Sequence, residues 1–320
     1  MNHKFTLFLA LMIFGTIGTW SLVTYSADRF DKDGLTPPRS IPVQSAQALN
    51  QEKLQKLIDS SRRRMTPDQM EKIRDAVKQS GILDQFQEMG LSSIVLFPLE
   101  KKLVILYTNR IAQIYPPKKG RAMLPLADFL RPLFKLARER SEGGGPVLEN
   151  RAAILAATLF ASGADLSLVL GKNAAIAHRP KIQPKQVSLS GRRDLMLHFL
   201  FSAGLALTTG PEQADKVGLE KELSDSRGGS GFSFVDLAAD RAGIQLALTA
   251  TAFPEEALMI QARMSRINKD TDIMPLTAGL PEGLSESEFI RLFKNTESKS
   301  FLLISKTIDE RIIRCPVYWQ

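Results

Sequence analysis

Three segments between residues 190 and 247 carry side chains of catalytic or metal-binding type within stretches that otherwise resemble packed helices. In the first segment, Asp194, His198 and Ser202 recur every fourth residue among Leu, Met, Phe and Ala. This spacing places the three side chains on one face of an α-helix. A solvent-facing stripe explains the pattern, but exposed stripes more often carry Lys, Glu or Arg. A His and a Ser between Phe and Leu therefore also indicate a functional site.

Two further helices are expected on either side of the Gly-rich turn 227–231. The helix before it, 212–226, and the helix after it, capped by Ser233, each place small and acidic residues on one face. The turn can fold the two helices back as an antiparallel hairpin, with Gly218 near Gly243 and the acids gathered at the turn end. These faces contain Ala214, Gly218, Glu222 and Asp225 in one helix, and Asp236, Asp240, Gly243 and Ala247 in the other.

Carboxylates gathered in a partly buried site repel one another unless bases, protons or a metal ion compensate for their charge. Neighbouring Arg and Lys side chains can form an ion network that only fixes the fold. Asp236 can also complete a capping box with Ser233, without any functional role. These structural interpretations stay open beside two functional ones.

One functional interpretation is a divalent metal ion, because carboxylates and an imidazole on facing helices are suitable ligands. The other is acid–base catalysis, in which His198 is the general base and Asp194, one turn away, orients it. The expected catalytic residues are His198, Asp194 and Glu222. The expected metal ligands are His198, Glu222, Asp225, Asp236 and Asp240.

The order of these residues resembles the pattern of a known family. It runs Arg193-Asp194-x-x-x-His198-Phe199, then Gly218-x-x-Lys221-Glu222-x-x-Asp225-Ser226, then Gly231-Phe232-Ser233-x-x-Asp236-Leu237-x-x-Asp240-x-x-Gly243. It is similar to the YfiM-like envelope proteins of bacteria, and more distantly to the VanZ-like membrane proteins. Since these relatives have no established reaction, the resemblance implies an envelope location and a helical architecture. The long N-terminal region and the extension beyond Phe253 depart from the family pattern.

The first 27 residues are expected to direct the chain to a membrane. An uncharged apolar run from Phe5 to Val23 follows Lys4 and is long enough to cross a bilayer core. Small residues, Ser26 and Ala27, follow the run, so a cleaved signal peptide and an uncleaved anchor both stay open. The remainder is expected to be periplasmic or otherwise extracytoplasmic, secreted or anchored by the N-terminal helix.

The composition favours an ordinary folded protein with a basic surface. The formal net charge is +8, but the basic residues are dispersed and the motif region is acidic, so a nucleic-acid partner is not expected. The expected partners are the membrane, through residues 1–27 if they are uncleaved, and an envelope component. Cys315 is the single cysteine, which excludes an internal disulfide.

The fold expected from these patterns is mainly α: a multi-helix globular protein with one small β-hairpin and an N-terminal membrane-targeting helix. Helices are predicted at 124–140 and 149–170, with two more between 285 and 314, whereas 94–97 and 103–107 are predicted to form the hairpin. The expected divisions are a signal peptide or membrane anchor (1–27), a linker (28–44), an N-terminal helical region with the hairpin (45–171), a connector (172–189), the motif region (190–253) and a C-terminal helical extension (254–320).

Two classes of function follow from the sequence. The first is an envelope-associated binding or assembly module whose charged cluster is structural. The alternative is a metal-assisted hydrolase that acts on a cell-envelope component. The first class is favoured, because the chain contains no HExxH, CxxC or GxSxG motif.

Overall fold

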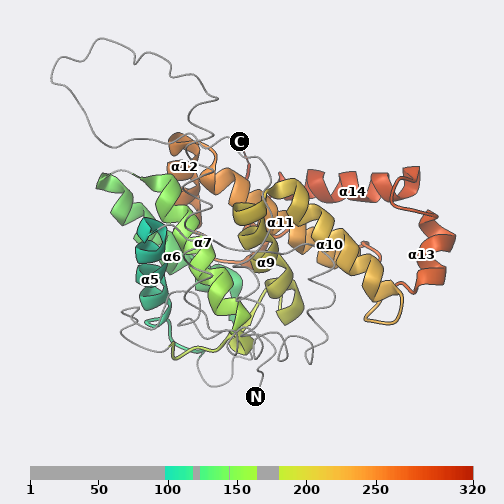
Figure 1. Ribbon diagram of the computed structural model, residues 1–320, viewed down its shortest axis with the longest axis horizontal. Helices are drawn as coiled ribbons and strands as arrows, with labels where there is room; N and C mark the ends of the chain where they lie inside the picture. Colours follow the sequence, from blue (N-terminus) through green and yellow to red (C-terminus); the bar gives the residue numbers. More distant parts are fainter. Residues whose placement is uncertain (1–97, 118–122, 144, 164–179, 320) are drawn as a thin grey trace, which may run out of the picture.

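The computed structural model describes residues 98–117, 123–143, 145–163 and 180–319, which form a mainly α-helical fold (Figure 1). The predicted membrane-targeting helix, the linker and residues 94–97 of the predicted hairpin lie outside these ranges. No helix in the described ranges is long and apolar enough to span a membrane.

The helices follow one another with short connections. Their bounds are α5 (Pro98–Ile111), α6 (Leu126–Arg140), α7 (Pro146–Ser162), α9 (Arg193–Thr209), α10 (Pro211–Ser226), α11 (Phe234–Thr251), α12 (Pro254–Met264), α13 (Glu286–Phe293) and α14 (Lys299–Ile312). Single turns of 3-10 helix lie at Ser141–Gly143, Pro184–Gln186 and Asp270–Asp272. Two short strands, β1 (Leu124–Pro125) and β2 (Val187–Ser188), pair in parallel, with Leu124 opposite Val187.

The predicted β-hairpin is wrong, because residues 103–107 lie inside α5. Val104, Tyr107 and Ile111 are buried and recur at spacings of three and four, which is the period of a helix face rather than of a strand. Pro98 starts the helix, a position where its missing N–H is not needed. The apolar run at 103–107 is too short for its period to distinguish a helix from a strand.

The other helix predictions are confirmed in type, with differences at their ends. Helix α7 begins at Pro146 rather than at residue 149. Helix α9 begins at Arg193 without a side-chain cap, and Ser190, which has a φ of 52°, lies in the turn before it. Ser233 caps α11 as predicted, and Ser285 forms a capping box with Glu288 at the start of α13.

The closest helix contact in the centre of the molecule is between α9 and α11. Gly243 of α11 lies against the backbone of Phe199 in α9, so that a Cβ at Gly243 would be 2.0 Å from the Phe199 carbonyl oxygen. Gly218 of α10 lies against the Asp240 carboxylate instead. The predicted pairing of Gly218 with Gly243 is therefore wrong, and each glycine admits a different neighbour.

The C-terminal helices α13 and α14 extend from the end of the bundle that carries the turn between α10 and α11 (Figure 1). An aromatic cluster joins them to the start of α11 through ring contacts such as Phe232 with Phe289 at 4.6 Å and Phe234 with Phe293 at 5.1 Å. The five rings of this cluster are Phe232, Phe234, Phe289, Phe293 and Phe301. The C-terminal extension is thus packed directly onto the residues that begin α11.

The α9–α11 contact predicts that Gly243→Ala lowers the free energy of unfolding by about 2–3 kcal/mol, since the new methyl group meets backbone that cannot rotate away. Chemical denaturation measures the change. Leu248→Ala, at an exposed position of the same helix, is the control and is expected to change stability by less than about 1 kcal/mol. A Gly243→Ala protein as stable as the parent would contradict the close packing.

Candidate functional site

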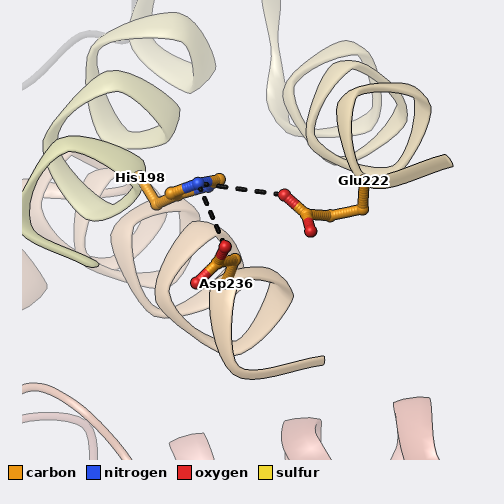
Figure 2. A group of neighbouring side chains, drawn as sticks. All are labelled: His198, Glu222 and Asp236. Carbon is orange, nitrogen blue, oxygen red and sulfur yellow. Dashed lines mark ion pairs between the residues drawn. The ribbon is translucent and has the colours of Figure 1, made fainter. Parts of the chain in front are cut away.

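A buried polar cluster lies where α9, α10 and α11 meet. Helix α9 contributes His198, α10 contributes Glu222 and α11 contributes Asp236 (Figure 2). All three side chains are at most 9% exposed. The two glycine contacts allow this meeting, because they bring the α9 backbone against α11 and the α10 backbone against Asp240.

The imidazole of His198 is fixed from one side by Asp240. Its Nδ1 lies 3.1 and 3.2 Å from the two Asp240 carboxylate oxygens, and the Ser202 hydroxyl donates to Oδ1 of the same carboxylate at 2.6 Å. An ionised carboxylate only accepts hydrogen bonds, so Nδ1 carries a proton and donates it to Asp240. The predicted orientation of His198 by Asp194 is wrong, because Asp240 has that role.

The opposite nitrogen of His198 faces two further carboxylates. Nε2 lies 3.5 Å from Oδ2 of Asp236 and 3.8 Å from Oε1 of Glu222, as the dashed lines in Figure 2 show. The predicted meeting of His198 with carboxylates from both later helices is therefore present in the structure. It involves Glu222, Asp236 and Asp240.

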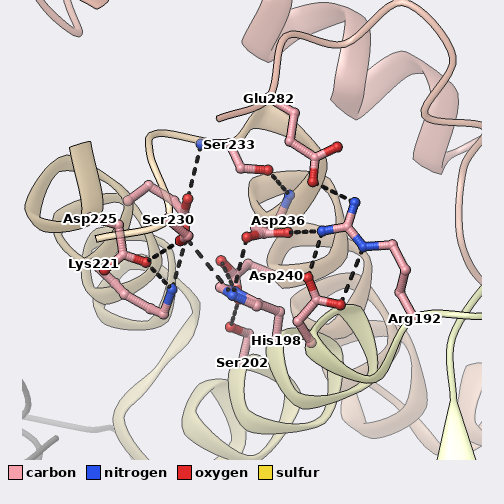
Figure 3. A network of polar contacts seen from close by, with 12 residues as sticks. Arg192, His198, Ser202, Lys221, Asp225, Ser230, Ser233, Asp236, Asp240 and Glu282 are labelled. Atoms are coloured by element: carbon pink, nitrogen blue, oxygen red, sulfur yellow. Dashed lines mark hydrogen bonds and ion pairs between the residues drawn. The ribbon is translucent and has the colours of Figure 1, made fainter. Parts of the chain in front are cut away.

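Glu222 is held by the residue that caps the next helix. The backbone N–H of Ser233 donates to Oε2 of Glu222 at 3.0 Å. The Ser233 hydroxyl accepts from the Asp236 N–H at 3.0 Å (Figure 3). In a complete capping box, the Asp236 carboxylate would accept from the Ser233 N–H. Because Glu222 occupies that donor, the Asp236 carboxylate can face His198.

Asp225 does not face His198. It accepts from Lys221 Nζ at 2.9 Å and from the Ser230 hydroxyl at 3.1 Å, and Lys221 also donates to Oε1 of Glu222 at 3.1 Å (Figure 3). Asp225 therefore positions the lysine beside Glu222. Its predicted place among the metal ligands is not supported by this geometry.

Asp194 also lies apart from His198, with a side chain that is 51% exposed. It accepts hydrogen bonds from Nε and Nη2 of Arg192, at 3.2 and 2.5 Å. Arg192 Nη2 also donates to Oδ1 of Asp236 at 3.3 Å, and its Nη1 forms an ion pair with Glu282 (Figure 3). Burial raises the pKa of Asp194, but the hydrogen bonds from Arg192 outweigh it and lower the pKa. Asp194 thus joins the cluster only through Arg192.

The pKa values show how strongly the buried groups interact. Burial lowers the pKa of His198, but the adjacent Asp240 carboxylate outweighs burial and the pKa is raised to about 9. Burial raises the pKa of Glu222 to about 7 and also raises that of Asp236. Burial would raise the pKa of Asp240, whereas the charge and hydrogen bond of His198 lower it. Without a metal ion, a protonated His198 therefore lies among carboxylates at neutral pH.

The donor set fits a transition-metal ion. The ligand atoms of His198, Glu222 and Asp236 all lie within 4.8 Å of one another. Two ligand atoms bound at about 2.1 Å are separated by roughly 3.0–3.4 Å. The separations of 3.5 and 3.8 Å from Nε2 would need a small contraction, and the two carboxylate oxygens, which lie within 4.8 Å of each other, would have to approach to the same distance. One imidazole with two carboxylates suits zinc or manganese better than calcium, which prefers oxygen alone.

No family model matches this chain, and neither a curated protein nor a solved structure matches it. The resemblance to the YfiM-like and VanZ-like proteins therefore stays a prediction. The sequence predicts Arg192 and Lys221 only as neighbouring bases of a structural ion network, which agrees with their contacts to the acids of the cluster. It gives no signal for Glu282, because this residue lies in a loop far from the motif region in the sequence.

In the presence of a chelator, raising the pH from about 5 to 9 is expected to lower the free energy of unfolding by about 5 kcal/mol, to which Glu222 and His198 contribute similar amounts. The folded-state pKa values of Glu222 and His198, about 7 and about 9, exceed the ordinary values of 4.5 and 6.5. Both groups thus bind protons more tightly in the folded state, and the stability they contribute is lost as the pH rises through these values. The charges of Lys221, Asp236 and Asp240 also act on the pKa values of Glu222 and His198: the lysine lowers both, and the two carboxylates raise both.

Denaturant unfolding at a series of pH values measures this effect. Glu222→Gln should flatten the lower part of the curve, between about pH 5 and 7, because it removes one of the two groups. Glu286→Gln, at an exposed residue of α13, should follow the parent curve. Parent stability that rises across this range would contradict the assigned protonation.

Proposed function

We propose that this chain is an extracytoplasmic, envelope-associated binding or assembly protein that holds a divalent cation at His198, Glu222 and Asp236. One observation carries the cation proposal: the two nitrogens of His198 have different partners. Nδ1 is bonded to Asp240, while Nε2 is directed at Asp236 and Glu222. A metal-binding histidine usually donates the proton of its other ring nitrogen to a carboxylate, which fixes the tautomer and the ring orientation.

The charge balance supports a cation over an ion network that is complete by itself. The connected cluster contains six carboxylates and only three basic side chains. The acids are Asp194, Glu222, Asp225, Asp236, Asp240 and Glu282, and the bases are Arg192, His198 and Lys221. Arg192 and Lys221 are each bonded to at least one acid outside the ligand set. Burial raises the pKa of Glu222 to about 7, although the positive charges of Lys221 and His198 lower it. A divalent cation would replace the Nε2 proton of His198 and compensate the two facing carboxylates together.

The positions of the ligands support a binding or assembly role. Each ligand lies on a different helix, and the Glu222 side chain is completely buried. A cation at this point would join α9, α10 and α11 and would add its binding free energy to the stability of their contact. Such a cross-link suits a protein that must keep its shape outside the cytoplasm.

A metal-assisted hydrolase that acts on an envelope component is the second candidate. The observation that favours it is the number of ligands, since three protein ligands leave coordination positions free for other groups. A bound cation would supply Lewis-acid chemistry. Among the residues of this chain, Asp240 orients His198 and Lys221 places a positive charge beside Glu222.

The proposed location is supported by the sequence alone. The apolar run from Phe5 to Val23 is typical of a signal peptide or anchor, and the net charge of +8 suits the anionic surface of an envelope. The partners proposed on this basis are the membrane, if the first segment is uncleaved, and an envelope component.

The cation proposal predicts that protein purified without a chelator contains one equivalent of a divalent metal ion. At a free concentration 100-fold above Kd, the cation should stabilise the fold by about 2.7 kcal/mol. Elemental analysis and thermal unfolding with and without chelator measure both effects. Glu222→Gln and Asp236→Asn should lose the metal ion and its stabilising effect.

Asp215→Asn is the matched control for these variants, because Asp215 lies on the same helix as Glu222 but is bonded to Arg241. It should retain the metal ion even if its stability falls. Parent protein that binds no divalent cation, with Glu222→Gln altering stability alone, would identify the cluster as an ion network.

The location predicts that a reporter enzyme active only outside the cytoplasm works when joined after Gln320. A reporter active only in the cytoplasm should be inactive at the same position, because residues 1–27 would export the chain. Deleting residues 5–23 should reverse both results. Activity of the cytoplasmic reporter on the complete chain would refute the proposed location.

A further inference from the structure

A loop from the C-terminal extension lies against the entrance to α11. Residues 275–284, which we call the strap, connect the turn that follows α12 to α13. The Phe232 N–H donates to the Leu284 carbonyl at 2.7 Å, the Leu284 N–H donates back at 3.0 Å, and the Phe234 N–H donates to the Pro281 carbonyl at 3.0 Å. The strap therefore binds both neighbours of Ser233, the residue that holds Glu222 and caps the helix of Asp236.

Close packing and α14 fix the strap in this place. Gly231 lies so near Gly283 that a Cβ on Gly231 would be 2.4 Å from the Gly283 carbonyl carbon. Arg311 of α14 donates to the carbonyls of Leu276 and Ala278, at 2.8 and 3.0 Å. The strap is thus held at both ends, by the start of α11 and by α14.

Glu282 of the strap reaches the cluster through Arg192 (Figure 3). Nη1 of Arg192 pairs with Glu282, and Nη2 donates to Oδ1 of Asp236. The other oxygen of Asp236, Oδ2, is the one that faces His198. Arg192 therefore fixes which oxygen of Asp236 is available to the ligand set.

We infer that Arg192 and Glu282 are positioning residues for Asp236, and that they couple docking of the strap to the cation affinity of the site. The inference rests on the proposed function, since it concerns the affinity of the same cation site. Outer partners of metal ligands act in this way, by restricting the ligand to the orientation that binds. The C-terminal extension is then a support of the site.

Arg192 and Glu282 are partly exposed, so a change in Glu282 can affect the orientation of Asp236 with little effect on stability. The side chains of Arg192 and Glu282 are 35% and 43% exposed, and ion pairs in contact with water contribute little to folding. Asp194 still holds the other edge of the guanidinium when Glu282 is changed. Removing the Glu282 charge should therefore loosen the contact between Arg192 and Asp236 without unfolding the chain.

Coupling between the strap and the cation must act in both directions. If a docked strap increases cation affinity, a bound cation must stabilise the docked strap by the same free energy. The amide of Leu284, which donates to Phe232, reports the docked state. Its hydrogen exchange should become slower when the cation binds.

Calorimetric titration of the full chain with Zn²⁺ or Mn²⁺ tests the inference. Glu282→Gln should weaken binding by about 3–10-fold, and Arg192→Lys, which keeps the charge but loses the planar fork, by about 10–100-fold. Glu286→Gln is the matched control, an exposed acid just beyond the strap, and should bind as the parent does. Thermal unfolding with chelator should be nearly unchanged in Glu282→Gln.

Hydrogen exchange provides the second measurement. The cation should slow exchange at Leu284 in the parent, and this protection should be smaller in Glu282→Gln. Parent protein that binds neither Zn²⁺ nor Mn²⁺ would overturn the proposed function and this inference together. Parent protein that binds the cation, with equal affinity and equal protection in Glu282→Gln, would overturn only the inference.

Discussion

The hydrogen bond between the Asp240 carboxylate and His198 is the interaction on which the rest of the cluster depends. Asp240 lies at the contact of α9 and α11, is 3% exposed, and is bonded to His198 and Ser202 on the facing helix. A buried carboxylate without partners would destabilise the fold strongly. The close approach of the helices at Gly243 brings these partners within reach. The small residue at Gly243 is therefore needed for the buried Asp240 charge to reach its hydrogen-bond partners.

The same interaction gives His198 its chemical character. Because Asp240 holds Nδ1, the ring has one orientation, and Nε2 must face the carboxylates of α10 and α11. A proton and the proposed metal ion would then compete for the position near Nε2, since either can compensate the negative charge there. The raised pKa values of Glu222 and His198 show that both groups bind protons tightly when no metal ion is present. The short separations between the ligand atoms would also suit a metal ion.

The C-terminal extension contributes to the cluster without contacting His198. Its aromatic side chains pack on Phe232 and Phe234, and its strap binds the backbone of the same two residues. Ser233 lies between them and connects to both Glu222 and Asp236. Rigid support of this kind limits the freedom of ligands and so reduces the entropy lost when a cation binds. The C-terminal extension is thus part of the architecture of the cluster.

The sequence by itself determined the helices of the motif region and which polar residues share a helix face, because helical spacing and a Gly-rich turn are local properties. It predicted a cluster around His198, but not which of the predicted acids face the imidazole. It did not determine the structure of residues 103–107, whose apolar run fits both periods. Only the tertiary structure decided that Asp240 rather than Asp194 orients His198, that Gly243 contacts Phe199, and that Glu282 reaches the cluster. Spacing fixes which residues share a face, whereas the rotation of each helix and the approach of distant loops follow from how the whole core packs.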